Sequence, residues 1–173
     1  MIVLDVIADG LLAAVAAIGF GAISNPPRRA FKYIAALAAI GHATRFALMT
    51  YSGMDIASAS FCASLTIGLV ALWFGRLSHC PLTVLYIPAL LPMIPGMYAY
   101  RSFYALIQLM QCINNYALSE TYMHQLIVNA TVTFSVVFLL AIGATLVLFI
   151  FPSKAYAMTR RKNYPEPPAP SSK

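Results

Sequence analysis

Charged residues are scarce in this sequence. Asp, Glu, Lys and Arg together make up 9% of its 173 residues, whereas 61% are hydrophobic. A soluble domain carries about 25% charged residues, because it needs them on its water-facing surface. The composition therefore excludes an ordinary soluble globular protein and indicates an integral membrane protein.

Metal-binding and catalytic patterns are lacking too. The three cysteines, Cys62, Cys80 and Cys112, lie far apart without a CxxC motif, so they predict neither a disulfide framework nor a metal site. No group of His, Cys, Asp and Glu has metal-ligand spacing, and no nucleophile–base motif stands out. We therefore expect no enzyme activity, no metal and no cofactor. The basic residues fit membrane topology better than nucleic-acid binding.

Long apolar runs take the place of these patterns. Five runs reach the roughly 20 residues that a membrane helix needs; they cover about 3–24, 31–51, 56–75, 81–110 and 122–151. The start, MIVLDVIADG, has acids where a signal peptide has basic residues, so we interpret it as part of a retained span. We expect an all-α, polytopic helix bundle over residues 1–151. Residues 152–173 form a Pro-rich, basic tail that we expect to be disordered.

The basic residues outside the spans fall on one side of a five-span arrangement. They are Arg28, Arg29, Lys32, Arg76 and, in the tail, Lys154, Arg160, Arg161, Lys162 and Lys173. The other side holds Asp5, Asp55 and Glu120. Lys and Arg accumulate in cytoplasmic loops. We therefore predict an outside N-terminus and a cytoplasmic C-terminus.

Small residues recur at four-residue spacing in the first three runs, which predicts close helix packing. The sets are Ala13, Ala17 and Gly21; Ala35, Ala39, Ala43 and Ala47; and Ser60, Ser64 and Gly68.

Polar groups inside the spans are the first functional candidates. Arg45 lies within the second run, where a charge is costly and faces the bundle interior, a cavity or a partner. Asp9 and Arg45 are equally far along the chain from Pro27, so a helical hairpin would place them at similar depth. We hypothesise an Asp9–Arg45 ion pair, functional or purely structural. His42, on the same helical face as Arg45, is either a proton-coupling residue or a hydrogen-bonded packing residue.

A cluster of helix breakers interrupts the fourth run. The stretch YIPALLPMIPGMYAY (86–100) contains Pro88, Pro92, Pro95 and Gly96, and each proline removes a backbone donor and clashes with the preceding turn. Irregular backbone at membrane depth is tolerated only when it is buried in protein or lines a wet cavity. Broken helices of this kind mark binding sites in secondary transporters. The stretch therefore predicts a proline-broken fourth helix.

We expect the first half-helix to end near 89–91 and the second to begin around Pro95. The N–H groups of Gly96, Met97 and Tyr98 would then be free, at a helix end that attracts carboxylates. The resulting substrate-binding candidates are Arg45, Pro92, Pro95, Gly96, Met97, Tyr98 and Arg101, with Asp9 and His42 as proton-coupling or ion-pair residues. The alternative is a kink filled by neighbouring side chains.

Three stretches resemble the threonine/serine exporter family: FGAISNPPRRAFKYIAALAAIGHATRF, ASFCASLTIGLVALWFGR and VLYIPALLPMIPGMYAY. The specific parts are N-P-x-R-A (Asn25, Pro26, Arg28 or Arg29, Ala30), G-H-x-x-R (Gly41, His42, Arg45) and P-x-x-P-G (Pro92, Pro95, Gly96). The resemblance covers about residues 9–151. It is closest to the small membrane subunit of the split form, the YjjB-like proteins.

This resemblance implies secondary export across the bacterial inner membrane. Single-chain members of the family carry two membrane halves and export threonine and serine. The split form pairs this small subunit with a larger one and is associated with succinate export. The expected partners are thus a larger subunit, the lipid bilayer and a small carboxylate or amino acid. The alternative is a non-transporting scaffold or assembly subunit for a larger membrane protein.

Overall fold

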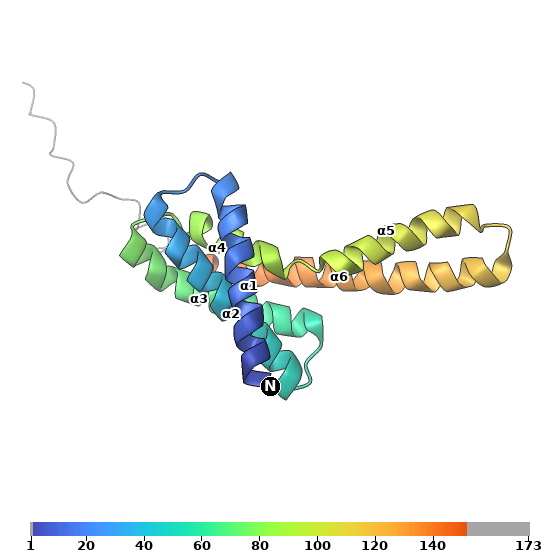
Figure 1. Ribbon diagram of the computed structural model, residues 1–173, viewed down its shortest axis with the longest axis horizontal. Coiled ribbons are helices and arrows are strands. Elements are labelled where there is room, and N and C mark those ends of the chain that lie inside the picture. The colour runs from blue at the N-terminus through green and yellow to red at the C-terminus, as the bar shows by residue number, and fades with distance from the viewer. Residues whose placement is uncertain (1, 152–173) are drawn as a thin grey trace, which may run out of the picture.

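The computed structural model describes residues 2–151, and every regular element in that range is a helix (Figure 1). The elements are α1 (Ile2–Ile23), the 3-10 helix η1 (Arg28–Ala30), α2 (Phe31–Tyr51), α3 (Ile56–Ser78), α4 (Leu82–Leu90), the 3-10 helix η2 (Leu91–Met93), α5 (Gly96–Gln111) and α6 (Tyr116–Ile150). The all-α class is confirmed. The predicted tail, 152–173, lies outside the described residues.

The number of strongly apolar spans is smaller than the predicted five. Within the described residues, α1, α3 and α6 are long and apolar enough to cross a membrane, and α4 with α5 makes a fourth if the bent pair counts as one span. The 21-residue helix α2 is long enough but contains Lys32, His42 and Arg45. It packs against α1, α3 and α4. Because α2 is surrounded by protein, it needs less apolar surface than a helix that faces lipid.

Close packing at small residues holds α1–α4 together. Ala13 and Ala17 of α1 are buried, as are Ser60 and Ser64 of α3, in agreement with their predicted packing role. On α2 the most buried residues are instead Ile34, Leu37, Ala38, Gly41 and His42. A methyl group at Gly41 would overlap the Ile67 side chain, so α2 and α3 approach each other closely at this point.

The second half of α6 joins this group of helices along α3. A Cβ atom at Gly143 would overlap the Ser64 hydroxyl and lie 3.0 Å from the Phe61 carbonyl oxygen. Val136, Leu140, Ala144 and Val147 are buried on the same stretch. We call α1–α4 with residues 136–150 of α6 the helix cluster.

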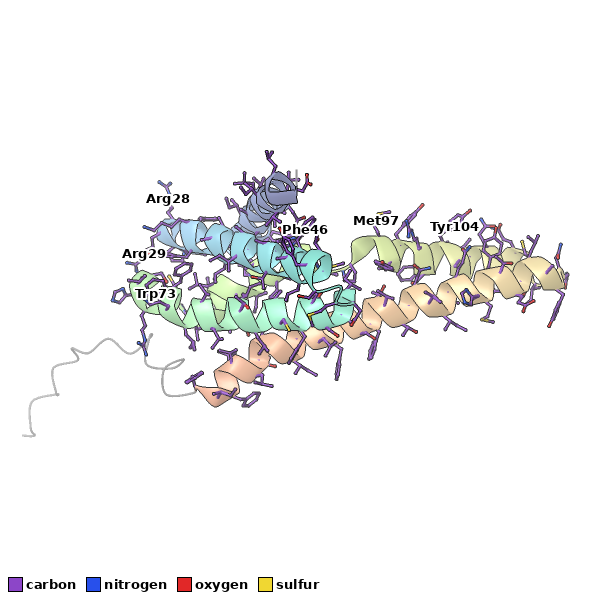
Figure 2. All side chains as sticks on the ribbon, turned by 90° about the horizontal axis from the view of Figure 1, so that it is seen from below. Arg28, Arg29, Phe46, Trp73, Met97 and Tyr104 are labelled. Carbon is purple, nitrogen blue, oxygen red and sulfur yellow. The ribbon has the colours of Figure 1, made fainter. Side chains whose placement is uncertain are left out.

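The remaining residues form an arm that projects from the helix cluster. It comprises α5 and residues 116–135 of α6, which lie side by side as a long hairpin (Figure 1). Its large apolar side chains face outward: Met97 and Tyr104 lie on the side of α5 away from α6 (Figure 2), and Phe103 is 68% exposed. Small or polar residues, such as Ala105 and Ser102, lie between the two helices. An outer surface of this kind must be covered by lipid or by another protein.

Candidate substrate site at the break between α4 and α5

The chain changes direction between α4 and α5. After Leu90, η2 runs to Met93, Ile94 is extended, and α5 begins at Gly96. The axes of the two segments differ by 54°. Pro92 and Pro95 have no N–H group, so the helical hydrogen-bond ladder cannot continue through them. The break exposes backbone carbonyls that would otherwise be used within a helix.

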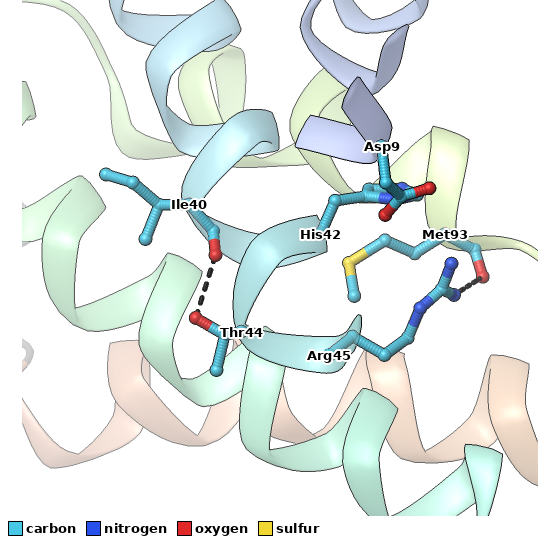
Figure 3. Close-up of polar contacts among 6 residues, drawn as sticks. All are labelled: Asp9, Ile40, His42, Thr44, Arg45 and Met93. Carbon is cyan, nitrogen blue, oxygen red and sulfur yellow. Dashed lines mark hydrogen bonds and ion pairs between the residues drawn. The ribbon is translucent and has the colours of Figure 1, made fainter. Parts of the chain in front are cut away.

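One of these carbonyls binds an arginine from another helix. The Arg45 guanidinium of α2 donates a hydrogen bond of 2.9 Å from one Nη atom to the Met93 carbonyl oxygen (Figure 3). Arg45 is partly buried. Sequence reasoning missed this acceptor, because a main-chain carbonyl becomes available only when the helix break is known residue by residue.

The predicted ion pair between Asp9 and Arg45 is wrong, because the partner of Asp9 is another residue of α2. The Asp9 carboxylate instead accepts a hydrogen bond of 3.0 Å from Nδ1 of His42; the two side chains overlap in the view of Figure 3. The donor is the imidazole, because an ionised carboxylate only accepts. The helical hairpin does bring Asp9 to the level of His42, whereas Arg45 lies three residues further along α2 and turns toward η2. Asp9 nevertheless remains within electrostatic reach of the Arg45 charge.

His42 is only 6% exposed, and its second ring nitrogen has no hydrogen bond. Among the residues that the structure describes, Nε2 is buried without a partner, although the Pro92 carbonyl lies within electrostatic reach of the ring. A buried polar atom without a partner costs about 1–3 kcal/mol. Such an atom calls for a specific explanation, for example an unseen water or a functional role. The contacts of Asp9 with His42 and of Arg45 with Met93 thus place a carboxylate, an imidazole and a guanidinium on one side of the helix break.

The free N–H groups predicted for the start of α5 are largely used. Gly96 N–H donates to the Ile94 carbonyl at 2.8 Å, and Tyr98 N–H donates to the Pro95 carbonyl at 3.1 Å. The prediction is therefore wrong for these two groups. The physical reason is that the chain curls back over the break and caps the first turn of α5 with its own carbonyls.

The predicted substrate-binding residues divide into two sets. Pro92 and Pro95 lie at the break, where Arg45 reaches Met93. Gly96, Met97, Tyr98 and Arg101 belong to α5, which packs mainly along α6. Gly96, Met97 and Arg101 are exposed. The structure thus does not bring this second set to Asp9 and His42 within the single chain.

A cavity beside the break adds residues that sequence reasoning did not select. Its volume is about 270 Å³, and it lies between α4, η2 and α6, lined by Tyr86, Ile87, Leu90, Leu91, Ile94, Val137, Leu140, Ala141, Ala144 and Thr145. The lining is mostly apolar, and Tyr86 and Thr145 are the lining residues whose side chains carry a hydroxyl. Its α6 side could not be predicted, because α6 is distant in sequence from the proline cluster.

A family model described as threonine/serine exporter, ThrE, matches residues 9–150. The chain belongs to the threonine/serine exporter family. The resemblance drawn from the sequence motifs is thereby confirmed, and with its apolar helices the chain is a multi-pass membrane protein of an exporter-type transporter family. No solved structure matches this chain. The matched region begins at Asp9 and contains His42, Arg45 and the whole helix break.

Proposed function

We propose that this chain is one subunit of a two-component secondary exporter of small carboxylates or amino acids. It would act with a larger partner subunit in the bacterial inner membrane, and its solute would be succinate, threonine or serine. The observation that carries the proposal is Arg45. This cation lies within the helix cluster, and its hydrogen bond goes to a main-chain carbonyl at the break. Its charge can therefore attract a substrate carboxylate.

The topology that we propose has five crossings, an outside N-terminus and a cytoplasmic C-terminus. It requires α2 to cross the membrane, although α2 is the least apolar of the long helices. Its contacts with α1, α3 and α4 support this crossing. The segment from α4 to α5 would be one broken span, with its 54° bend at the substrate site.

The substrate site that we propose has two walls. Arg45, Pro92 and Pro95 form the first, inside the helix cluster. Gly96, Met97, Tyr98 and Arg101 form the second, on the start of α5. Because much of this second wall is exposed, the larger subunit is needed to enclose the substrate there.

Asp9 and His42 are the groups that we propose for proton coupling. Their 3.0 Å contact makes the affinity of each for a proton depend on the other, and an imidazole changes charge near physiological pH. The variant His42→Gln keeps a polar side chain but cannot titrate. We expect it to flatten the dependence of efflux on pH between about 5 and 8. A pH profile that is unchanged from that of the wild type would remove His42 from coupling.

Efflux from loaded cells without exporters of their own tests the proposal. The chain, its candidate partner and both together are expressed, and succinate, threonine and serine are followed in the medium. The proposal predicts efflux of at least one solute only when both chains are present. Efflux from this chain alone would overturn the two-component arrangement. Absence of efflux with both proteins in the membrane would count against export of these three solutes.

A scaffold function is the second candidate, and the outward apolar side chains of the arm favour it. A scaffold would stabilise its partner without moving a solute. Deleting this chain would then remove the partner protein from the membrane. Restoring the chain as its Arg45→Ala variant would recover the full scaffold function. The exporter proposal predicts that Arg45→Ala restores the partner's abundance but not efflux.

A further inference from the structure

A strongly basic surface lies at one end of the helix cluster. It contains Arg28, Arg29 and Lys32, from η1 and the first turn of α2, and Arg76 from the last turn of α3. These are four of the six Lys and Arg residues in the described range. We call these four residues the basic end.

No carboxylate neutralises the basic end within residues 2–151. The described acids lie elsewhere: Asp5 and Asp9 in the first half of α1, Asp55 at the opposite end of α3, and Glu120 at the far end of the arm. The only ion pair described joins His42 to Asp9. Four cations therefore share one surface without an anionic partner.

Aromatic contacts hold the two halves of this surface together. Tyr33 of α2 packs on Phe74 of α3 with ring centroids 5.2 Å apart, and Trp73 stacks on Phe74 at 5.9 Å. The Lys32 ammonium lies 5.0 Å from the centre of the Tyr33 ring. Trp73 is 65% exposed, and Figure 2 shows it near Arg28 and Arg29 at the same end of the molecule.

The loop before α2 is anchored, so the backbone that carries its arginines is held in place. Pro26 and Ala30 are buried, and Ala30 N–H donates to the Pro27 carbonyl at 2.7 Å. Arg28 and Arg29, between these anchors, are exposed. Cations on an anchored backbone beside an exposed tryptophan match a phospholipid headgroup, whose phosphate accepts guanidinium hydrogen bonds while the indole lies at headgroup level.

We propose that the basic end and Trp73 form a binding surface for the headgroups of anionic phospholipids. A role in topology alone requires only positive charge on one side of the membrane. A headgroup site requires in addition that the cations bind anionic lipid in preference to zwitterionic lipid. Clusters of basic residues next to membrane helices attract anionic lipid with about fivefold affinity per Lys or Arg.

Native mass spectrometry of the full chain in detergent tests this inference, because no membrane orientation exists there. The probes are phosphatidylglycerol and phosphatidylcholine with the same acyl chains. The triple variant R28Q/R29Q/R76Q should bind phosphatidylglycerol far more weakly, whereas R28K/R29K/R76K should keep most of the binding. Arg101→Gln, which removes one exposed cation from the arm, should not change it.

The single variant Arg28→Gln covers the case in which the triple variant does not fold. Its side chain is exposed, and it should bind phosphatidylglycerol about fivefold more weakly. Equal binding of the two lipids by the wild type would overturn the proposal and leave these residues a role in topology only. Unchanged phosphatidylglycerol binding by Arg28→Gln together with R28Q/R29Q/R76Q would overturn it as well.

Discussion

The helix cluster and the arm are built in opposite ways. In the cluster, small residues such as Ala17, Ser64 and Gly143 let helices approach closely, and the inside holds polar contacts, His42 with Asp9 and Arg45 with the Met93 carbonyl. In the arm, the small and polar residues lie between only two helices, and large apolar side chains such as Phe103 cover the outside. The cluster has a core of its own, whereas the arm presents its apolar surface to whatever surrounds it.

This difference indicates that the helix cluster and the arm have different roles. The cluster holds the candidate substrate and coupling residues, because a buried charge needs the enclosure of several helices. The arm carries the second wall of the proposed site and the surface that the larger subunit would cover. The comparison predicts that substitutions in the two regions affect different measurements.

The largest effect is expected from Arg45→Ala. Loss of a charged hydrogen-bonding group costs about 1.5–3 kcal/mol. We therefore expect efflux by the proposed two-subunit exporter to fall at least about tenfold, with normal amounts of both proteins in the membrane. Thr44→Val is the matched control, because the Thr44 hydroxyl binds only the Ile40 carbonyl of its own helix (Figure 3). Equal efflux by the two variants would show that the Arg45 side chain takes no part in transport.

A substitution at the crossing of α3 and α6 should act on stability. At Gly143 an added methyl group meets Ser64 and the Phe61 carbonyl, and such overpacking costs about 1–3 kcal/mol. Gly143→Ala should therefore lower the thermal stability of the chain in detergent. Gly19→Ala is the control, because nothing lies within 4 Å of its added methyl group. Equal melting temperatures for the two variants would contradict the close crossing.

A substitution on the arm should act on association instead. Phe103 is 68% exposed, so Phe103→Ala should change the stability of the isolated chain by less than about 0.5 kcal/mol. Association with the proposed larger subunit, measured by co-purification, should weaken by at least about 1 kcal/mol, as for an aromatic side chain that becomes buried at an interface. A large loss of stability in the isolated chain, with association intact, would show that the arm has a core of its own.

The smallest effect is expected at the N-terminus of α3. The Asp55 carboxylate accepts hydrogen bonds from the N–H groups of Ala57 and Ser58 and from the Ser58 hydroxyl. The Ser58 bonds are the main cause of a pKa below its usual value of 3.8. A lowered carboxyl pKa means that the stabilisation is complete above the unfolded-state pKa. It is lost as pH falls through the lower, folded-state pKa.

Wild type and Asp55→Ala should therefore differ slightly in melting temperature at neutral pH. The difference should shrink as pH falls below the unfolded-state pKa of about 3.9, and vanish once the carboxyl is protonated in the folded state as well. A pH-independent difference between the two proteins would show that the charge of Asp55 plays no part in capping α3.

Local features of this fold could be predicted from the sequence, whereas the rotation of each helix about its own axis could not. Proline and glycine chemistry acts within a few residues, so α4 ends at Leu90 and α5 begins at Gly96 close to the expected positions. The depth of Asp9 followed from the length of the hairpin. The hydrogen-bond partner of Asp9 could not be predicted, because the choice between His42 and Arg45 depends on how α1 and α2 are rotated about their axes. The outward direction of the arm likewise depends on tertiary packing against α6.

Substrate protection of an engineered cysteine tests most directly whether the break between α4 and α5 binds the solute. Cys62, Cys80 and Cys112 are replaced by alanine and Gly96 by cysteine, since Gly96 is exposed with nothing within 4 Å of an added Cβ. The variant is expressed with the larger subunit, and maleimide labelling is timed with and without succinate, threonine or serine. We predict that the solute exported by the pair slows labelling, and that Arg45→Ala abolishes this protection. Labelling at the same rate under saturating amounts of the exported solute would contradict a substrate site at the break.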